Sequence, residues 1–151
     1  MVANVLSKLK EADELDNTLL VITGDHGQEA NDNKLNYWGH NSNFTDVQVK
    51  VPFAIIGPGI NAQTIKQERG ALTSHQDIVP TLMKHYLGVQ NETRDYSAGV
   101  DLLDDEVKRE WVMSSNYSGY AIITDHTILE VDPSGQYQLL DKRNLGTNEP
   151  I

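Results

Sequence analysis

The chain has 151 residues, of which 38% are hydrophobic and 23% charged, a composition typical of a globular domain with one core. Its formal net charge of −10 disfavours nucleic acid and anionic membrane surfaces as the main partners of this segment. The absence of cysteine excludes disulfides and thiolate metal sites. No apolar run reaches the length of a transmembrane helix, and the first residues lack the pattern of a signal peptide.

The chain begins with an amphipathic pattern and continues into an uninterrupted apolar run. Apolar residues at helical spacing predict a helix over residues 2–12. Residues 19–22 are apolar without alternation, which is typical of a strand buried on both faces of a parallel sheet. A helix followed by such a strand is half of a βαβ unit, so we expect the sheet to continue in sequence upstream of this chain.

A long polar segment separates this strand from the next one. Residues 28–43 are rich in Asn, Asp and Gly and predict a loop, and ordered loops of this length tend to be functional. A second strand is expected at residues 49–56, closed by Gly57-Pro58-Gly59. A second helix is expected at residues 73–88, with Asp77 as a candidate cap.

The last third of the chain changes to short strands separated by turn residues. Strands are expected at residues 111–114, 120–124, 127–131 and 137–140, arranged as an antiparallel meander. Asp125-His126 and Asp132-Pro133-Ser134-Gly135 are typical of the tight turns between such strands. The sequence thus predicts an α/β core at residues 1–103, a small antiparallel sheet at 104–143 and a tail at 144–151.

Asp25 and His26 lie between two glycines where the first apolar run ends. Ligands of open α/β sheets bind beyond the carboxyl ends of strands, so this point is a candidate site. Both side chains reach one ion only if the backbone turns, which Gly24 and Gly27 permit. A carboxylate oxygen and an imidazole nitrogen suit Mn²⁺ or Zn²⁺ and fit Mg²⁺ or Ca²⁺ less well. Taken alone, such a dipeptide is more often an Asp turn beside a hydrogen-bonded histidine.

The long loop contributes a second candidate, His40. In a functional role it would hold an anionic oxygen or carry a proton near neutral pH. Taken alone, it is more often an ordinary surface histidine. Tyr37 and Trp38, just before it, either line a pocket or hold the loop against the core.

The other histidines are weaker candidates. His75 lies before the second predicted helix, where it either touches an anion at the helix start or packs against the helix. We expect His85 to be exposed, because it lies off the apolar stripe of that helix, and His126 to be a turn residue.

Five motifs occur in a fixed order along the chain: Gly24-Asp25-His26-Gly27, Trp38-Gly39-His40, Val51-Pro52-Phe53 with Gly57-Pro58-Gly59, His75-Gln76-Asp77-Ile78-Val79-Pro80-Thr81-Leu82, and Gly99-Val100-Asp101-Leu102. Together they resemble the sulfatases, which belong to the alkaline-phosphatase superfamily. The resemblance extends over nearly the whole chain. Each motif alone is weak, but five in this order are specific.

The resemblance implies a fold and a set of roles. The fold is α/β: part of a sulfatase-like sandwich, with a mainly parallel sheet between helices and a small C-terminal antiparallel sheet. Asp25 and His26 match the late metal-ligand pair of the family, which implies a divalent metal, Mn²⁺ favoured over Mg²⁺, Zn²⁺ or Ca²⁺. His40 matches the catalytic residue that contacts the sulfate or phosphate group of an anionic ester.

In the detail of their amino-acid sequence, residues 37–44 and Asp95-Tyr96-Ser97 resemble inner-membrane sulfatase-like proteins of Gram-negative bacteria. These carry an N-terminal membrane part and a periplasmic globular domain, and they are linked to lipopolysaccharide and cardiolipin homeostasis. The resemblance therefore implies the periplasmic face of the inner membrane, with membrane attachment through an upstream segment. The segment itself is expected to be soluble.

The chain also departs from the family pattern. The family nucleophile and the earlier metal ligands come from the first half of the domain, and a chain without cysteine cannot form formylglycine. We therefore expect this segment to be the second half of the domain, inert on its own, with the metal weakly bound or absent. Its uncovered sheet edge makes self-association a further expectation.

Three hypotheses follow. The first is a fragment of a metal-dependent hydrolase or phosphotransferase that acts on sulfate or phosphate esters in the bacterial envelope. The second is a sulfatase-like module without catalysis that binds lipopolysaccharide or cardiolipin and regulates lipid homeostasis, since a fold does not determine its chemistry. The third is an unrelated α/β domain, in which substitution of Asp25 or His40 would leave every activity unchanged.

Overall fold

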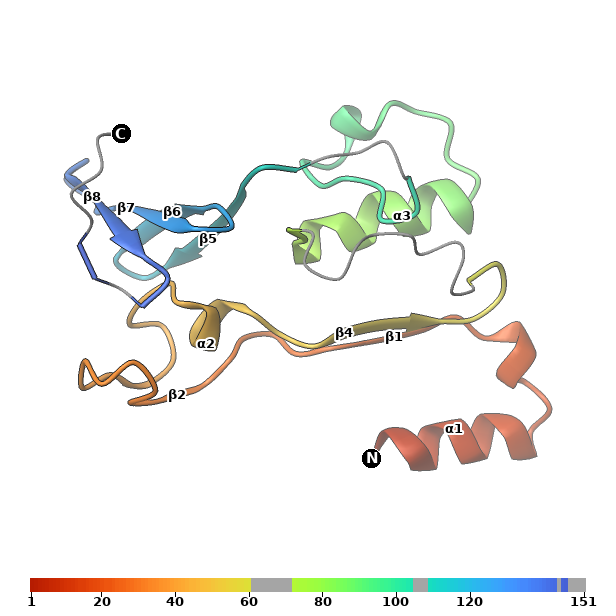
Figure 1. Ribbon diagram of the computed structural model, residues 1–151. Coiled ribbons are helices and arrows are strands. Elements are labelled where there is room, and N and C mark those ends of the chain that lie inside the picture. Colours follow the sequence, from red (N-terminus) through yellow and green to blue (C-terminus); the bar gives the residue numbers. More distant parts are fainter. Residues whose placement is uncertain (61–71, 105–108, 144, 147–151) are drawn as a thin grey trace. The chain divides into compact units, whose positions relative to one another are not determined.

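The computed structural model of the chain describes residues 1–60, 72–104, 109–143 and 145–146 (Figure 1). The chain divides into two compact units, Met1–Asp25 with Val51–Lys66 and His26–Lys50 with Gln67–Ile151. Of the predicted tail at 144–151, all but 145–146 lies outside the described residues. No helix in the described ranges is long and apolar enough to cross a membrane.

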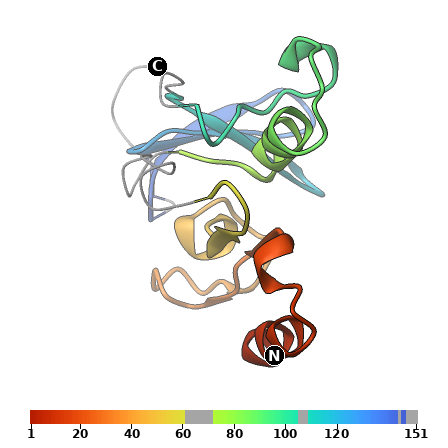
Figure 2. The same cartoon turned by 90° about the vertical axis from the view of Figure 1, so that its right-hand side faces the viewer.

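The first unit contains a helix and a two-stranded ribbon. Helix α1 (Val2–Glu11) confirms the predicted helix, and a 3-10 turn, η1 (Leu15–Asn17), leads to β1 (Leu20–Thr23). In Figure 1, α1 and β1 run side by side in opposite directions, because the chain reverses at η1, and Figure 2 views the helix along its axis. Strand β4 (Phe53–Ile56) pairs with β1.

The ribbon corrects two expectations. β1 and β4 are antiparallel, and all strand pairs within the described residues are antiparallel, so the parallel neighbour predicted for β1 is not formed there. The second strand begins only at Phe53, because residues Asp46–Val49 form the short helix α2. Pro52 contributes no N–H and holds the residue before it in an extended conformation, so the ladder starts after it.

The second unit ends in the predicted meander. Strands β5 (Val112–Asn116), β6 (Gly119–Ile123), β7 (Thr127–Val131) and β8 (Tyr137–Asp141) pair antiparallel in chain order. Asp125-His126 forms the turn between β6 and β7, and the Gly135 N–H donates to the Asp132 carbonyl in the next turn, both as predicted.

The core of the second unit joins this sheet to the loop that carries His40. Phe44, 1% exposed, packs in one cluster with side chains of three strands: Ala121, Ile123, Ile128 and Leu140. Figure 1 shows α2, just after Phe44, beneath the sheet. The polar loop is therefore held in place by a hydrophobic contact with a sheet that lies about eighty residues later in the sequence.

The predicted helix at 73–88 begins with a 3-10 turn, η2 (His75–Asp77), before α3 (Ile78–His85). Asp77 is fully buried, and its carboxylate accepts bonds from the Ser74 and Val100 N–H groups and two from Arg109 at 2.9 and 2.7 Å. Asp77 is the N-cap residue of α3, as predicted, but its side chain makes no capping bond to α3 and instead joins three segments of the chain. Helix α3 ends at His85 with Tyr86 as its C-cap, three residues short of the predicted end at residue 88, where Gly88 has φ +68.

A second buried carboxylate, Asp101, lies beyond the 3-10 turn η3 (Thr93–Asp95) and bonds the last turn of α3. The Asp101 side chain is 6% exposed and accepts bonds from Lys84 at 3.0 Å and His85 at 2.8 Å. Burial alone would raise the pKa of this carboxyl, but bonds from the Leu103 N–H, Lys84 and His85 outweigh burial and lower the pKa.

Truncating Phe44 should destabilise the second unit. We expect Phe44→Ala to lower the free energy of unfolding by about 3–5 kcal/mol, because it removes a large buried side chain and leaves a cavity. Urea unfolding followed by circular dichroism measures the loss. The control Tyr117→Ala, at a turn residue 95% exposed, should change stability little, and equal losses in the two variants would contradict the assigned core.

Stability should fall on acidification below about pH 4, in part through Asp101. A carboxyl with a lowered folded-state pKa stabilises the protein above its unfolded pKa, and this contribution is lost as pH falls through the folded value. Asp101→Asn should cost about 1–3 kcal/mol at pH 7 and flatten the acid-side slope of stability against pH. Asp125→Asn, in an exposed turn, is the control, and an unchanged slope in Asp101→Asn would contradict this account.

Candidate functional site

A short two-stranded ribbon brings the two predicted histidines together. β2 (Glu29–Ala30) pairs with β3 (Trp38–Gly39), with Glu29 opposite Gly39. Continuing this register by one residue places Gln28 opposite His40. The ribbon therefore returns the chain so that His40 lies near the residues that follow Asp25.

Gly27 sets the position of this ribbon against α2. Its N–H donates to the Gln48 carbonyl at 2.8 Å. A Cβ at this position would lie 2.0 Å from the Val47 carbonyl oxygen, so only glycine permits the approach. Glycine is therefore required at position 27 because α2 leaves no room for a side chain, in addition to the backbone turn that the sequence suggested.

The rings of His26 and His40 stack on each other. Their centroids are 4.0 Å apart and their planes differ by 23°. Nδ1 of His26 lies 2.8 Å from the Gly27 carbonyl oxygen, and Nδ1 of His40 lies 3.1 Å from Gln28 Oε1. Both oxygens only accept, so each ring carries its shared proton on Nδ1 and its lone pair on Nε2.

This tautomer fits the predicted metal role of His26. Histidines that bind metals donate their other ring N–H to a carbonyl or carboxylate, as His26 does. Asp25 directly precedes His26 in the sequence, as the last residue of the first unit. Within the described ranges, no group of three or more His, Asp or Glu side chains is arranged to hold an ion.

A buried carboxylate holds the loop between the two histidines. Glu29 is 1% exposed, and its Oε2 accepts from Gln48 Nε2 at 2.7 Å and Asn43 Nδ2 at 2.8 Å. Its Oε1 accepts from Asn33 at 3.3 Å. The same Gln48 amide also accepts from the Ser42 N–H and donates to its hydroxyl. These bonds join β2 to α2 and fix the return of the chain after His40.

The structure separates the other candidates from this pair. His75 lies in η2. His85 is exposed as a residue, as expected, but its side chain is only 34% accessible because its ring binds Asp101. His126 is the predicted turn residue between β6 and β7. Trp38 is 67% exposed, so Phe44, and not Trp38, holds the loop against the core.

Sequence reasoning missed the residues that build the site around the histidines: Gln28, Glu29, Asn43 and Gln48. Polar residues in a polar loop give no periodic signal. The only available hint was Glu29 itself, a carboxylate two residues after a glycine that the motif already marked.

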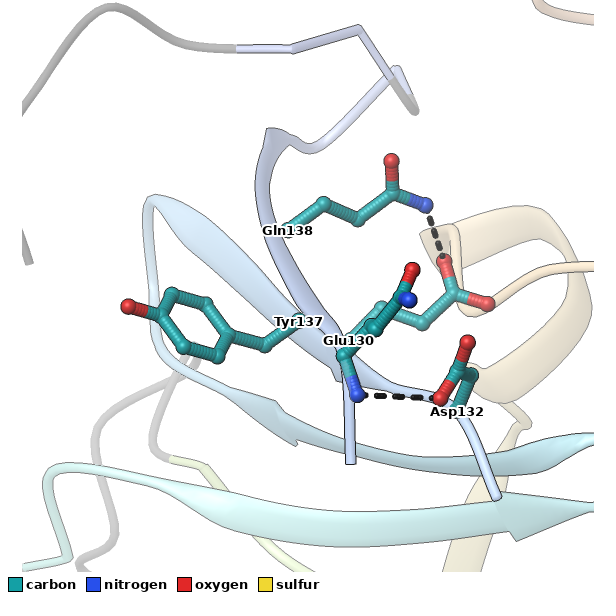
Figure 3. Close-up of a pocket in the computed structure, with 5 residues that line it drawn as sticks. Glu130, Asp132, Tyr137 and Gln138 are labelled. Carbon is teal, nitrogen blue, oxygen red and sulfur yellow. Dashed lines mark hydrogen bonds between the residues drawn. The ribbon is translucent and has the colours of Figure 1, made fainter. Parts of the chain in front are cut away.

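A separate hollow lies beside the β7–β8 hairpin, lined by Glu130, Asp132, Gln136, Tyr137 and Gln138 (Figure 3). Gln138 donates to Glu130, and Asp132 accepts the Gln136 N–H. In Figure 3 the Tyr137 ring points away from the carboxylates, in line with strand alternation. The aromatic ring and the carboxylates therefore do not face one common ligand, and the polar contacts shape the hairpin.

Glu29→Gln should loosen the loop. The new amide N–H would face the amide donors of Asn43 and Gln48, leaving buried groups unsatisfied at a cost of about 1–3 kcal/mol. Hydrogen exchange of residues 26–50 measures the effect, which should appear as faster exchange confined to that segment. The control is Glu110→Gln at an exposed position, and unchanged exchange in Glu29→Gln would contradict the assigned network.

Comparison with known proteins relates this geometry to a family. The chain is 31% identical over 137 residues to the inner membrane protein YejM of Salmonella typhimurium, an alignment that covers 91% of this chain and 22% of the relative. It is 31% identical over 140 residues to arylsulfatase K of Gallus gallus, covering 83% of this chain and 25% of the relative. The chain thus spans about a quarter or less of these relatives, and the match to YejM confirms the finer resemblance noted in the sequence.

Solved structures agree on the fold. A 2-O GAG sulfatase superposes with a TM-score of 0.75 at 23% identity, covering 98% of this chain and 35% of that one. A putative sulfatase from Bacteroides thetaiotaomicron superposes with a TM-score of 0.69 at 24% identity, covering 93% and 32%. The family model described as Sulfatase matches residues 1–89, more than half of the chain. The chain therefore belongs to the sulfatase family.

Proposed function

We propose that the protein containing this segment is a metal-dependent hydrolase or phosphotransferase acting on sulfate or phosphate esters in the bacterial envelope. The observation that carries the proposal is the stacked pair of His26 and His40, each with its lone pair on Nε2. Family membership supplies the reaction class.

Each residue has a distinct role in this proposal. Asp25 and His26 hold a divalent metal, with Mn²⁺ favoured over Mg²⁺, Zn²⁺ and Ca²⁺. When bound, such an ion supplies positive charge that stabilises the anionic group in the transition state. His40 takes up a proton at Nε2, and the resulting N–H donates a hydrogen bond to an oxygen of the transferred group.

The segment alone is proposed to be inert. Two protein ligands are fewer than the three that catalytic sites commonly use, and the attacking Ser or Thr would come from protein outside this chain. The missing half of the domain is thus the first partner of this segment, and the ester is the second.

The alternative is a sulfatase-like module that binds lipopolysaccharide or cardiolipin without catalysis. The similarity to YejM, which is named an inner membrane protein, favours a setting at a membrane. The periplasmic face and attachment through an upstream segment belong to both proposals. Both also require recognition of an anionic phosphate or sulfate, so turnover separates them.

The test measures hydrolysis of nitrophenyl phosphate and nitrophenyl sulfate with each metal, by the longest natural form of the protein. Asp25→Ala and His26→Ala should remove metal-dependent turnover, and His40→Gln should reduce kcat by about 10²–10⁴-fold, the usual contribution of a general acid or base. The control is His126→Ala, at an exposed turn. Metal affinity, measured in parallel by Mn²⁺ titration, should fall in the first two variants alone.

Two results would overturn the catalytic proposal. One is the absence of turnover under every metal, and the other is turnover that is indifferent to all three substitutions. If turnover is absent, binding to cardiolipin vesicles and to lipid A that is lost in His40→Gln would support the alternative. Unaltered binding would leave the histidine pair without either function.

A further inference from the structure

We propose that Gln28 is a positioning residue of this site: its side-chain oxygen fixes the tautomer and ring plane of His40, so that Nε2 is the atom presented to an anionic ester. The role of Nε2 in binding the ester rests on the function proposed above, whereas the contact between Gln28 and His40 does not depend on that function. Neither the motifs nor the family resemblance gave Gln28 a role.

Gln28 is held opposite His40 by the backbone on both sides of it. The preceding residue, Gly27, is bonded to Gln48, and the following residue, Glu29, is buried and opposite Gly39 in the ribbon. The side chain of Gln28 therefore has a fixed starting point. Its Oε1 lies 3.1 Å from Nδ1 of His40, within hydrogen-bond distance.

One acceptor determines two properties of the ring. An imidazole exposed to water exchanges between two neutral tautomers, whereas an acceptor at Nδ1 selects the form with its lone pair on Nε2. The same bond, together with stacking on His26 at 4.0 Å, restrains rotation of the ring about its side-chain bonds. Nε2 is thereby both basic and fixed in direction.

The chemistry of the acceptor suits an anionic ligand. A carboxylate at position 28 would accept the same proton, but it would add a negative charge beside the site in a chain whose net charge is already −10. A neutral amide supplies the acceptor without repelling a sulfate or phosphate group. We therefore assign the amide at this position to tautomer selection at an anion site.

The experiment reads the tautomer directly in this chain. Long-range ¹⁵N–¹H spectra of the imidazole rings, recorded at a pH well above the ordinary histidine range, distinguish a proton on Nδ1 from one on Nε2. In the unmodified chain, His40 should carry its proton on Nδ1. Gln28→Met, which keeps the length of the side chain and removes the acceptor, should shift His40 towards the Nε2–H form, and Gln28→Glu should restore Nδ1–H.

Gln138→Met is the matched control, since this amide bonds Glu130 on the C-terminal sheet. It should leave the His40 signals unchanged. An Nδ1–H tautomer that persists in Gln28→Met, with the remaining spectrum unchanged, overturns the proposal. Should Gln28→Met perturb folding, Gln28→Ala gives the same comparison with a smaller side chain.

A second arm separates this proposal from the proposed function. In the longest natural form of the protein, Gln28→Met should lower kcat/KM for the nitrophenyl esters by about tenfold or more, as loss of a supporting residue commonly does. Gln28→Glu should restore the tautomer while raising KM, because it adds a negative charge. If the tautomer responds as expected but no form shows turnover, the positioning role stands and the ester chemistry falls.

Discussion

The arrangement of the site depends on one buried carboxylate. Glu29 is almost wholly removed from solvent and accepts hydrogen bonds from three side-chain amides, two in the loop and that of Gln48 in α2. A buried charge is costly unless its oxygens are hydrogen-bonded, so the loop is stable only in the arrangement that brings those amides to Glu29. Stacking of His26 on His40 follows, because the ribbon that begins at Glu29 places the second histidine beside the first.

Two further buried contacts hold the second unit together, the first of them on this loop. Phe44 inserts the end of the loop among side chains of the four-stranded sheet, and Asp77 joins η2 to the segment before that sheet through Arg109 and Val100. Apolar burial stabilises the first contact, and paired charges and N–H donors stabilise the second. The exposed histidines thus lie on a loop whose own backbone is held at several points.

The family motifs combine chemical and structural residues. In the fourth motif, Asp77 is buried and connects separate segments through hydrogen bonds, whereas His75 lies at the surface of η2. Gly99 of the fifth motif approaches the Gln76 carbonyl so closely that a Cβ would lie 2.1 Å from its oxygen. Gly27 of the first motif has the same steric origin. The motifs of this chain therefore include residues that the fold requires, and not only candidates for chemistry.

The sequence by itself determined the elements with local signals. Helix α1, the strand after it, the four-stranded meander and its turns follow from periodicity and turn residues, and the ordered motifs identified the family. Only the tertiary structure decided the pairing direction of β1, the helical turn α2 in place of a strand start, and the partners of His40. Those outcomes depend on contacts such as Glu29 with Gln48, nineteen residues apart, between polar residues that have no periodic pattern. Such contacts form only when the chain folds back on itself, so no local pattern in the sequence encodes them.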